Sequence, residues 1–172
     1  MGLTHRWRVR PRRASINILI TCFKNISKLD KGYTIYVHNL GGFDAIFILK
    51  TLASLHGKFN ILMDGTKDTI SLSIKNHCVI KDSYRILNGS LATLSKIFNV
   101  PVQKSQFDHS KVTLNNLADI RSELIEYLNK DLISLVDVMI AATLNIFKIY
   151  QVDVSETYSA SSLAMKIFRT NF

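Results

Sequence analysis

The chain has 172 residues, of which 47% are hydrophobic and 20% are charged. This composition predicts one globular domain with a hydrophobic core, and it excludes a disordered chain. Lysine and arginine number 22 against 13 acidic residues, which gives a formal charge of +9 and a pI near 9.7. The positive charge favours a polyanionic partner, either nucleic acid or an acidic membrane surface.

The cysteines and histidines do not indicate a zinc site or a disulfide framework. Cys22 and Cys78 are isolated and lack CxxC spacing, and the five histidines are scattered. No run of about 18 apolar residues occurs, so we expect no membrane span and no membrane partner.

The first 28 residues form a basic lead-in. The stretch from Arg6 to Arg13 contains five arginines and no acidic residue. Its composition is typical of a transit peptide, and a basic arm that contacts a phosphate backbone would have the same composition. A third explanation requires no function, namely an arbitrary start on a truncated reading frame. Residues 16–23 are mostly apolar and fit either a strand or a helix.

A strand, a turn and a helix follow one another in the next part of the chain. Residues 33–37 are rich in β-branched and aromatic side chains and predict a strand. Gly41 and Gly42 predict a turn that lets the backbone approach whatever lies at the end of the strand, which is where ligands bind in open α/β sheets. Apolar spacing from Ala45 predicts a helix of about three turns. Asp44 would then be its N-cap, and from this unit alone capping explains Asp44 better than chemistry does.

The middle of the chain predicts further strands. Residues 58–63 and 69–74 are apolar-rich runs separated by a turn-forming segment, which indicates a hairpin. A third run covers residues 78–81, so we expect a mixed sheet. A short helix over residues 91–98 is ended by a proline, and residues 104–116 form a polar connection.

The segment from Leu117 to Tyr150 contains neither proline nor glycine and has a helical stripe of apolar residues. Asp131 lies inside this stripe. Burying a charge costs several kcal/mol unless a cation pairs with it. Asp131 therefore takes part in a structural ion pair or, as we prefer, in metal binding or catalysis. Tyr127 lies four residues earlier on the same face, so the phenol and the carboxylate can converge on one point.

Two of these features match motifs of a known family. The segment from Asn39 to Asp44 resembles the second exonuclease motif of family B DNA polymerases, Asn-x(2-3)-Phe/Tyr-Asp. Its residues are similar to those of the protein-primed branch of the family. Viruses and the linear plasmids of fungal and plant mitochondria carry polymerases of this branch. The segment from Tyr127 to Asp131 resembles the third motif, Tyr-x(3)-Asp, and follows in the correct order.

Shorter matches support the resemblance. Residues 81–91 are similar to the family segment Asp-Ser-Leu-Arg-x-Leu-Pro-x-Ser-Leu, whose Ser-Leu pair helps to bind single-stranded DNA. Ser83 matches the serine, and Tyr84 replaces the leucine. Lys104 matches the lysine of a Lys-x-x-hydrophobic motif that serves the exonuclease site, although alone it would be an ordinary solvated loop lysine. Residues 161–169 look like the segment that leads to the polymerase domain, or like an amphipathic terminal helix.

The resemblance covers roughly residues 29–172 and implies an α/β, ribonuclease-H-like fold, a mixed sheet flanked by helices. It also implies a two-metal exonuclease site that uses Mg²⁺ or Mn²⁺. Asp44 and Asp131 would be metal ligands that face each other across a shared pocket, and Tyr127 and Lys104 would be further catalytic residues.

The first exonuclease motif of the family, Asp-x-Glu, is missing, because the only acidic residue before Asp44 is Asp30. We therefore expect a domain that is incomplete at its N-terminus, binds metal weakly and has little or no exonuclease activity. By resemblance the chain is a piece of a protein-primed DNA polymerase. The expected parts are a basic arm and lead-in (1–28), an exonuclease-like domain (29–150) and the start of a linker or helix towards a missing polymerase domain (151–172).

The partner implied by the resemblance is the single-stranded 3′ end of DNA. The resemblance assigns contacts with DNA to Asn39, Phe43 and Ser83, although Phe43 could equally be part of the core. A terminal protein as a second partner and a mitochondrial location are implied as well. Two other classes of function stay open, a basic nucleic-acid-binding module without catalysis and an interaction scaffold.

Overall fold

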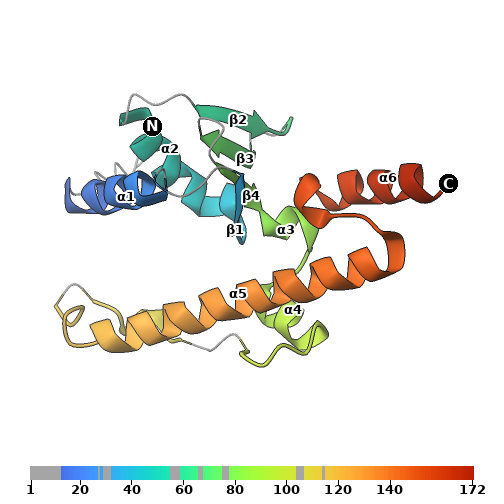
Figure 1. Cartoon of the computed structure of the whole chain (residues 1–172). Coiled ribbons are helices and arrows are strands. Elements are labelled where there is room, and N and C mark those ends of the chain that lie inside the picture. Colours follow the sequence, from blue (N-terminus) through green and yellow to red (C-terminus); the bar gives the residue numbers. More distant parts are fainter. Residues whose placement is uncertain are drawn as a thin grey trace, which may run out of the picture. The chain divides into compact units, whose positions relative to one another are not determined.

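The computed structural model describes residues 13–26, 28, 32–54, 59–65, 68–74, 78–103, 107–113 and 115–172, shown in Figure 1. The chain divides into two compact units. Unit 1 comprises residues 1–35 and 41–80, and unit 2 comprises residues 36–40 and 81–172. Most of the basic arm, residues 1–12, and Lys104 lie outside the described residues. The expected division at residues 28 and 150 stays a prediction.

A four-stranded sheet has the strand order β1-β4-β3-β2. Its strands are β1 (Tyr33–Val37), β2 (Phe59–Met63), β3 (Thr69–Ile74) and β4 (Cys78–Asp82). β2 and β3 lie in unit 1, whereas β1 and β4 begin in unit 1 and end in unit 2. β2 pairs antiparallel with β3, with Phe59 opposite Ile74 and an irregularity at Leu62/Met63. The predicted hairpin is therefore confirmed.

Unit 1 also contains two helices, α1 (Arg13–Ile26) and α2 (Ala45–Ser54), which contact each other. The apolar stretch that fitted a strand or a helix is thus helical, and its Phe23 is buried. Other buried side chains of this unit come from α2, β3 and β4, namely Ala45, Leu52, Leu72, Cys78 and Ile80.

The connection from β1 to α2 is a π-helical turn, η1 (Leu40–Asp44), that continues directly into α2. Asp44 therefore ends a helical turn, which differs from the simple N-cap expected from the sequence. Gly41 is needed for close packing within unit 1, because a Cβ at this position would lie 3.2 Å from the carbonyl oxygen of Thr69. The absence of a side chain at Gly41 thus lets this turn pack closely against β3.

Unit 2 is mainly helical. Its helices are α3 (Ser83–Ile86), α4 (Leu91–Ile97), η2 (His109–Lys111), α5 (Arg121–Tyr150), η3 (Val154–Glu156) and α6 (Ala160–Asn171). α4 packs against α5 (Figure 1) through a cluster that includes Leu91, Leu94 and Val138. A second cluster joins three parts of the unit: α3, α6 and the segment between α5 and α6. Its buried residues are Ile86, Val152, Val154 and Leu163.

The long helix begins at Arg121, a few residues later than the apolar pattern suggested. A local turn precedes it, in which the Asn116 side chain accepts a 2.8 Å hydrogen bond from Thr113 N. The hydroxyl of Thr113 in turn accepts one of 3.3 Å from Asn116 N.

Among the described helices, α5 alone is long and apolar enough to cross a membrane, with a mean hydropathy of 1.9 over its most apolar window. The sequence did not predict this, because acidic residues such as Asp131 and Asp137 interrupt the apolar run. A core helix of a soluble protein meets the same criteria, so this finding assigns no membrane to the chain.

Candidate functional site

The turn after β1 is bonded to the end of β4. The backbone N–H of Asn39 donates a 2.9 Å hydrogen bond to Oδ1 of Asp82, the last residue of β4. The same oxygen accepts a 3.0 Å bond from Tyr84 N and caps α3. Because β1 and β4 are neighbours in the sheet, these bonds show that both strands end at the same edge.

A histidine that the sequence analysis did not single out completes this junction. Nδ1 of His38 lies 3.0 Å from the hydroxyl of Ser83, and Nε2 lies 3.0 Å from the carbonyl oxygen of Gly89. Ser83 is fully buried, so its hydroxyl lies inside this network. The contact with DNA assigned to Ser83 stays a prediction, and in the structure the residue binds His38. The sequence carried one local signal for this site, which is Asp82. It stands at the end of a strand and before a helix, where an aspartate is a common N-cap.

Two side chains of the junction face solvent. Asn39 is exposed and has a φ of 65°, in the left-handed region that asparagine tolerates better than most residues. Tyr84 is 40% exposed, and its ring meets the ring of His38 edge-on at a centroid distance of 5.7 Å. The end of the sheet therefore presents a carboxamide and an aromatic ring on residues whose backbone amides bind one carboxylate oxygen.

The other predicted residues of the exonuclease site are distributed over both units. Asp44 is exposed in unit 1, and Asp131 lies on α5 in unit 2. The side chain of Phe43 and all of Lys104 lie outside the described part of the structure. A metal pocket shared by Asp44 and Asp131 stays a prediction.

On α5 the phenol of Tyr127 and the carboxylate of Asp131 meet, as their spacing predicted. Burial raises the pKa of Tyr127, and a hydrogen bond with Asp131 and the charge of that carboxylate raise it further. Asp131 is half-buried, and its Oδ1 is shielded from solvent. The ring of Phe107 packs against Tyr127 at a centroid distance of 5.2 Å. One turn further along α5, the buried Ser134 hydroxyl has no hydrogen-bond partner among the described residues.

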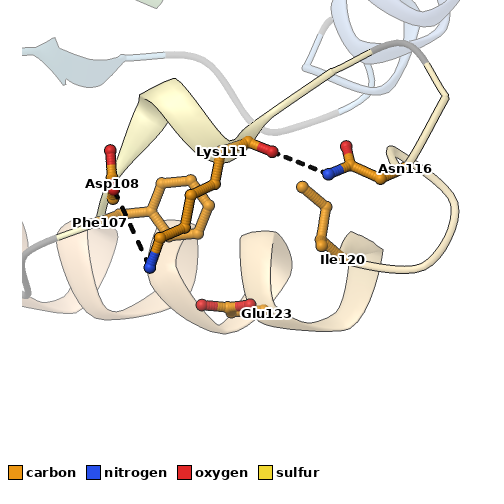
Figure 2. Close-up of a pocket in the computed structure, with 6 residues that line it drawn as sticks. All are labelled: Phe107, Asp108, Lys111, Asn116, Ile120 and Glu123. Atoms are coloured by element: carbon orange, nitrogen blue, oxygen red, sulfur yellow. Dashed lines mark hydrogen bonds and ion pairs between the residues drawn. The ribbon is translucent and has the colours of Figure 1, made fainter.

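A cavity of about 550 Å³ lies beside the first turns of α5, in a segment that the sequence suggested was only a polar connection. Figure 2 shows its lining, which mixes apolar, acidic and basic side chains: Phe107, Asp108, Lys111, Asn116, Ile120 and Glu123. Lys111 lies 3.9 Å from Asp108, and Asn116 Nδ2 donates a 2.8 Å bond to the Lys111 carbonyl. Both contacts join residues of the cavity lining.

The described residues do not supply a complete two-metal site. Such a site needs several carboxylates from different elements. In the part of the chain that the structure describes, no three His, Cys, Asp or Glu residues gather as metal ligands. Asp44 and Asp131 stay predicted ligands.

The fold matches that of solved DNA polymerases. Similar structures are phi29 DNA polymerase complexed with single-stranded DNA (TM-score 0.53, 22% identity) and the same enzyme in a ternary complex with primer-template DNA and incoming nucleotides (0.56, 21%). The matches cover 77% and 79% of this chain and 25% of each polymerase chain. The class is therefore α/β, with the ribonuclease-H-like arrangement of a mixed sheet and flanking helices that the resemblance implied.

Sequence comparison gives the family. The family model for DNA polymerase type B, organellar and viral, matches residues 25–118 and 111–172. The chain belongs to this family, which confirms the predicted kinship with protein-primed polymerases. Proteins described as probable DNA polymerases are similar to it: that of Ascobolus immersus is 30% identical over 200 residues, and that of Agaricus bitorquis is 26% identical over 185. These matches cover 90% and 84% of this chain but 17% and 23% of the relatives, so the chain spans about a fifth of their length.

Proposed function

We propose that this chain serves DNA replication as the part of a protein-primed DNA polymerase that holds the single-stranded 3′ end of the DNA. The observation that carries the proposal is the junction of Asn39, Asp82 and Tyr84 at the end of the sheet, in a chain of this polymerase family. In α/β sheets the ends of strands are where ligands bind.

The chemistry of the junction suits an unpaired nucleotide. Proteins bind single strands by stacking bases on aromatic rings and by hydrogen bonds to base edges. The exposed carboxamide of Asn39 can both donate and accept such bonds. The exposed ring of Tyr84, which replaces the family's leucine, offers a larger stacking surface than leucine does. The formal charge of +9 adds attraction to the phosphate backbone.

The second part of the proposal concerns exonuclease activity. Asp44, Asp131, Tyr127 and Lys104 match the family's exonuclease residues and would use Mg²⁺ or Mn²⁺. Without an Asp-x-Glu pair in this sequence, we propose that the chain by itself hydrolyses DNA very slowly or not at all. A terminal protein as a partner and a mitochondrial location extend the proposal, supported by kinship with organellar and viral polymerases.

Oligonucleotide binding tests the main proposal. We expect the chain to bind a fluorescent oligothymidylate of about 12 nucleotides, a length within the site size of single-strand binders, with an affinity that falls steeply as salt rises. Asn39→Ala should weaken binding about five- to tenfold, the effect of losing one or two hydrogen bonds. Asn99→Ala is the matched control, because Asn99 is also exposed and also has a left-handed φ, of 49°. Equal affinities of the two variants would contradict the assignment of Asn39 to DNA.

A digestion assay tests the exonuclease part of the proposal against a second candidate, a basic nucleic-acid-binding module without catalysis. The net charge favours that candidate, and it predicts binding without any release of nucleotides. We therefore incubate a 3′-labelled single strand with the chain and Mn²⁺. Release of nucleotides that Asp44→Ala or Asp131→Ala abolishes would establish catalysis and exclude the module, whereas binding without release agrees both with the module and with the very slow or absent hydrolysis proposed above.

A further inference from the structure

We propose that His38 is a positioning residue for single-strand binding, because its imidazole holds the turn that presents Asn39. The inference rests on the proposed function, since contact with DNA by Asn39 is part of that proposal. It also makes a separate claim about the backbone of the turn, which can be measured without DNA.

One of the two hydrogen bonds of His38 requires a proton on Nε2. Nε2 faces the carbonyl oxygen of Gly89 at 3.0 Å, and a carbonyl oxygen only accepts, so Nε2 carries a proton. Nδ1 faces the Ser83 hydroxyl at 3.0 Å and, in the neutral ring, accepts its proton. The other acceptor within reach of this hydroxyl, the Val37 carbonyl, is 3.4 Å away, which is a poorer distance. A neutral ring protonated at Nε2 therefore satisfies both partners.

Both partners of His38 are held firmly. Ser83 is fully buried at the start of α3. Gly89 has a φ of +154°, which L side chains rarely adopt, so the direction of its carbonyl depends on a backbone conformation suited to glycine. His38 thus ties the turn after β1 to two fixed points between β4 and α4.

The residues on both sides of Asn39 in the sequence are held in place. His38 precedes it, the fully buried Leu40 follows it, and its own N–H binds Asp82. Its left-handed φ carries an energetic cost for an L residue, and the surrounding bonds maintain it. The side chain of Asn39 is exposed, and the turn determines the direction in which it leaves the backbone. Preorganisation of this kind saves the entropy that binding would otherwise lose.

His38 also supports the second exposed group of the junction. Its ring meets that of Tyr84 at an interplanar angle of 73°, the edge-to-face geometry that aromatic pairs prefer. Removal of the imidazole would therefore loosen both the amide and the aromatic surface offered to a nucleotide.

Two substitutions test the role of the ring. His38→Ala removes both hydrogen bonds, and we expect it to weaken binding of the oligothymidylate about tenfold. In His38→Gln the amide nitrogen can occupy the position of Nε2 and donate to Gly89 O, so we expect affinity within about threefold of the wild type. Rescue by glutamine but not alanine distinguishes positioning by hydrogen bonds from mere filling of space.

Amide hydrogen exchange followed by NMR provides the second readout. In the wild type the Asn39 N–H should exchange slowly, because it binds Asp82, and the nitrogen shifts of His38 should indicate the form protonated at Nε2. In His38→Ala the Asn39 amide should exchange at least tenfold faster. The amides of α5 should keep their wild-type exchange rates, which shows that the fold persists.

The outcomes separate this inference from the proposed function. If Asn39→Ala weakens binding and His38→Ala does not, the positioning role is overturned while the proposed function stands. An unchanged Asn39 exchange rate in His38→Ala overturns the role as well. If the wild type binds no oligonucleotide, the proposed function fails, and the exchange rate of Asn39 alone decides whether His38 holds the turn.

Discussion

The Asn39 N–H and the Asp82 carboxylate form a hydrogen bond that joins residues 43 positions apart and closes one edge of the sheet. Asp82 is buried, and it binds the turn that bears the predicted DNA contact as well as the first turn of α3. A single carboxylate therefore couples the stability of this region to the geometry of the candidate site.

We expect Asp82→Ala to lower the free energy of unfolding by about 2–4 kcal/mol, because two backbone donors lose a charged acceptor. Urea unfolding followed by circular dichroism measures the loss. Asp119→Ala is the control, since Asp119 is an exposed aspartate in a surface turn, and its removal should change stability by less than about 0.5 kcal/mol. Equal unfolding midpoints for the two variants would refute the structural role of Asp82.

Lys81, the residue before Asp82, holds the segment between α5 and α6. Its buried ammonium donates to the carbonyl oxygens of Ser155 and Thr157 and lies 4.2 Å from the centroid of the Tyr158 ring. Burial lowers the pKa of Lys81, an effect that the charge of Asp153 partly offsets. The two carbonyls depend on this amine for a donor.

We expect Lys81→Met to cost about 1–3 kcal/mol, because methionine keeps the apolar stem but leaves both carbonyls without the amine. Lys96→Met, at an exposed lysine of α4, should leave stability nearly unchanged. Urea denaturation of both variants makes the comparison, and a Lys81→Met protein as stable as Lys96→Met would show that the carbonyls find other donors.

Glycine substitutions test the close packing in unit 1. A Cβ at Gly41 would lie 3.2 Å from Thr69 O, whereas a Cβ at Gly65 would meet nothing within 4 Å. We expect Gly41→Ala to destabilise the chain by about 1–3 kcal/mol, as overpacking does, and Gly65→Ala to stay within about 0.5 kcal/mol of the wild type. Thermal unfolding of the pair checks this, and a lower melting temperature for Gly65→Ala than for Gly41→Ala would contradict it.

Stability at alkaline pH should depend on Tyr36 in unit 2. Burial raises the pKa of Tyr36, and the negative charge of Asp153 raises it further. In the unfolded chain the phenol loses its proton near pH 10, before the folded state does, so stability falls as pH rises from that value through the folded pKa.

Tyr36→Phe removes this titration, and Asp153→Asn reduces the shift while keeping a side-chain oxygen for Ser155 N. We therefore expect the wild type to lose more stability between about pH 9 and about pH 11 than Asp153→Asn does, and Tyr36→Phe to lose least. Urea midpoints at the two pH values give the order. Identical losses in all three proteins would show that Tyr36 is not the group responsible.

Much of the secondary structure and the family could be predicted from the sequence, because both depend on local patterns. Alternating β-rich residues marked β1, helical spacing marked α2 and α5, and a turn between apolar runs marked the hairpin of β2 and β3. The segments from Asn39 to Asp44 and from Tyr127 to Asp131 carried the resemblance to family B polymerases, and the four-residue spacing placed the phenol beside the carboxylate.

The candidate site itself was decided by tertiary structure. Nothing in the local pattern indicates that Asp82 binds Asn39, that His38 bridges Ser83 and Gly89, or that Ser83 is buried. The cavity beside α5 and the approach of Gly41 to β3 were likewise missed. Periodicity records which side of an element is apolar, whereas these contacts depend on which elements become neighbours when the sheet forms, and that information is shared among distant residues.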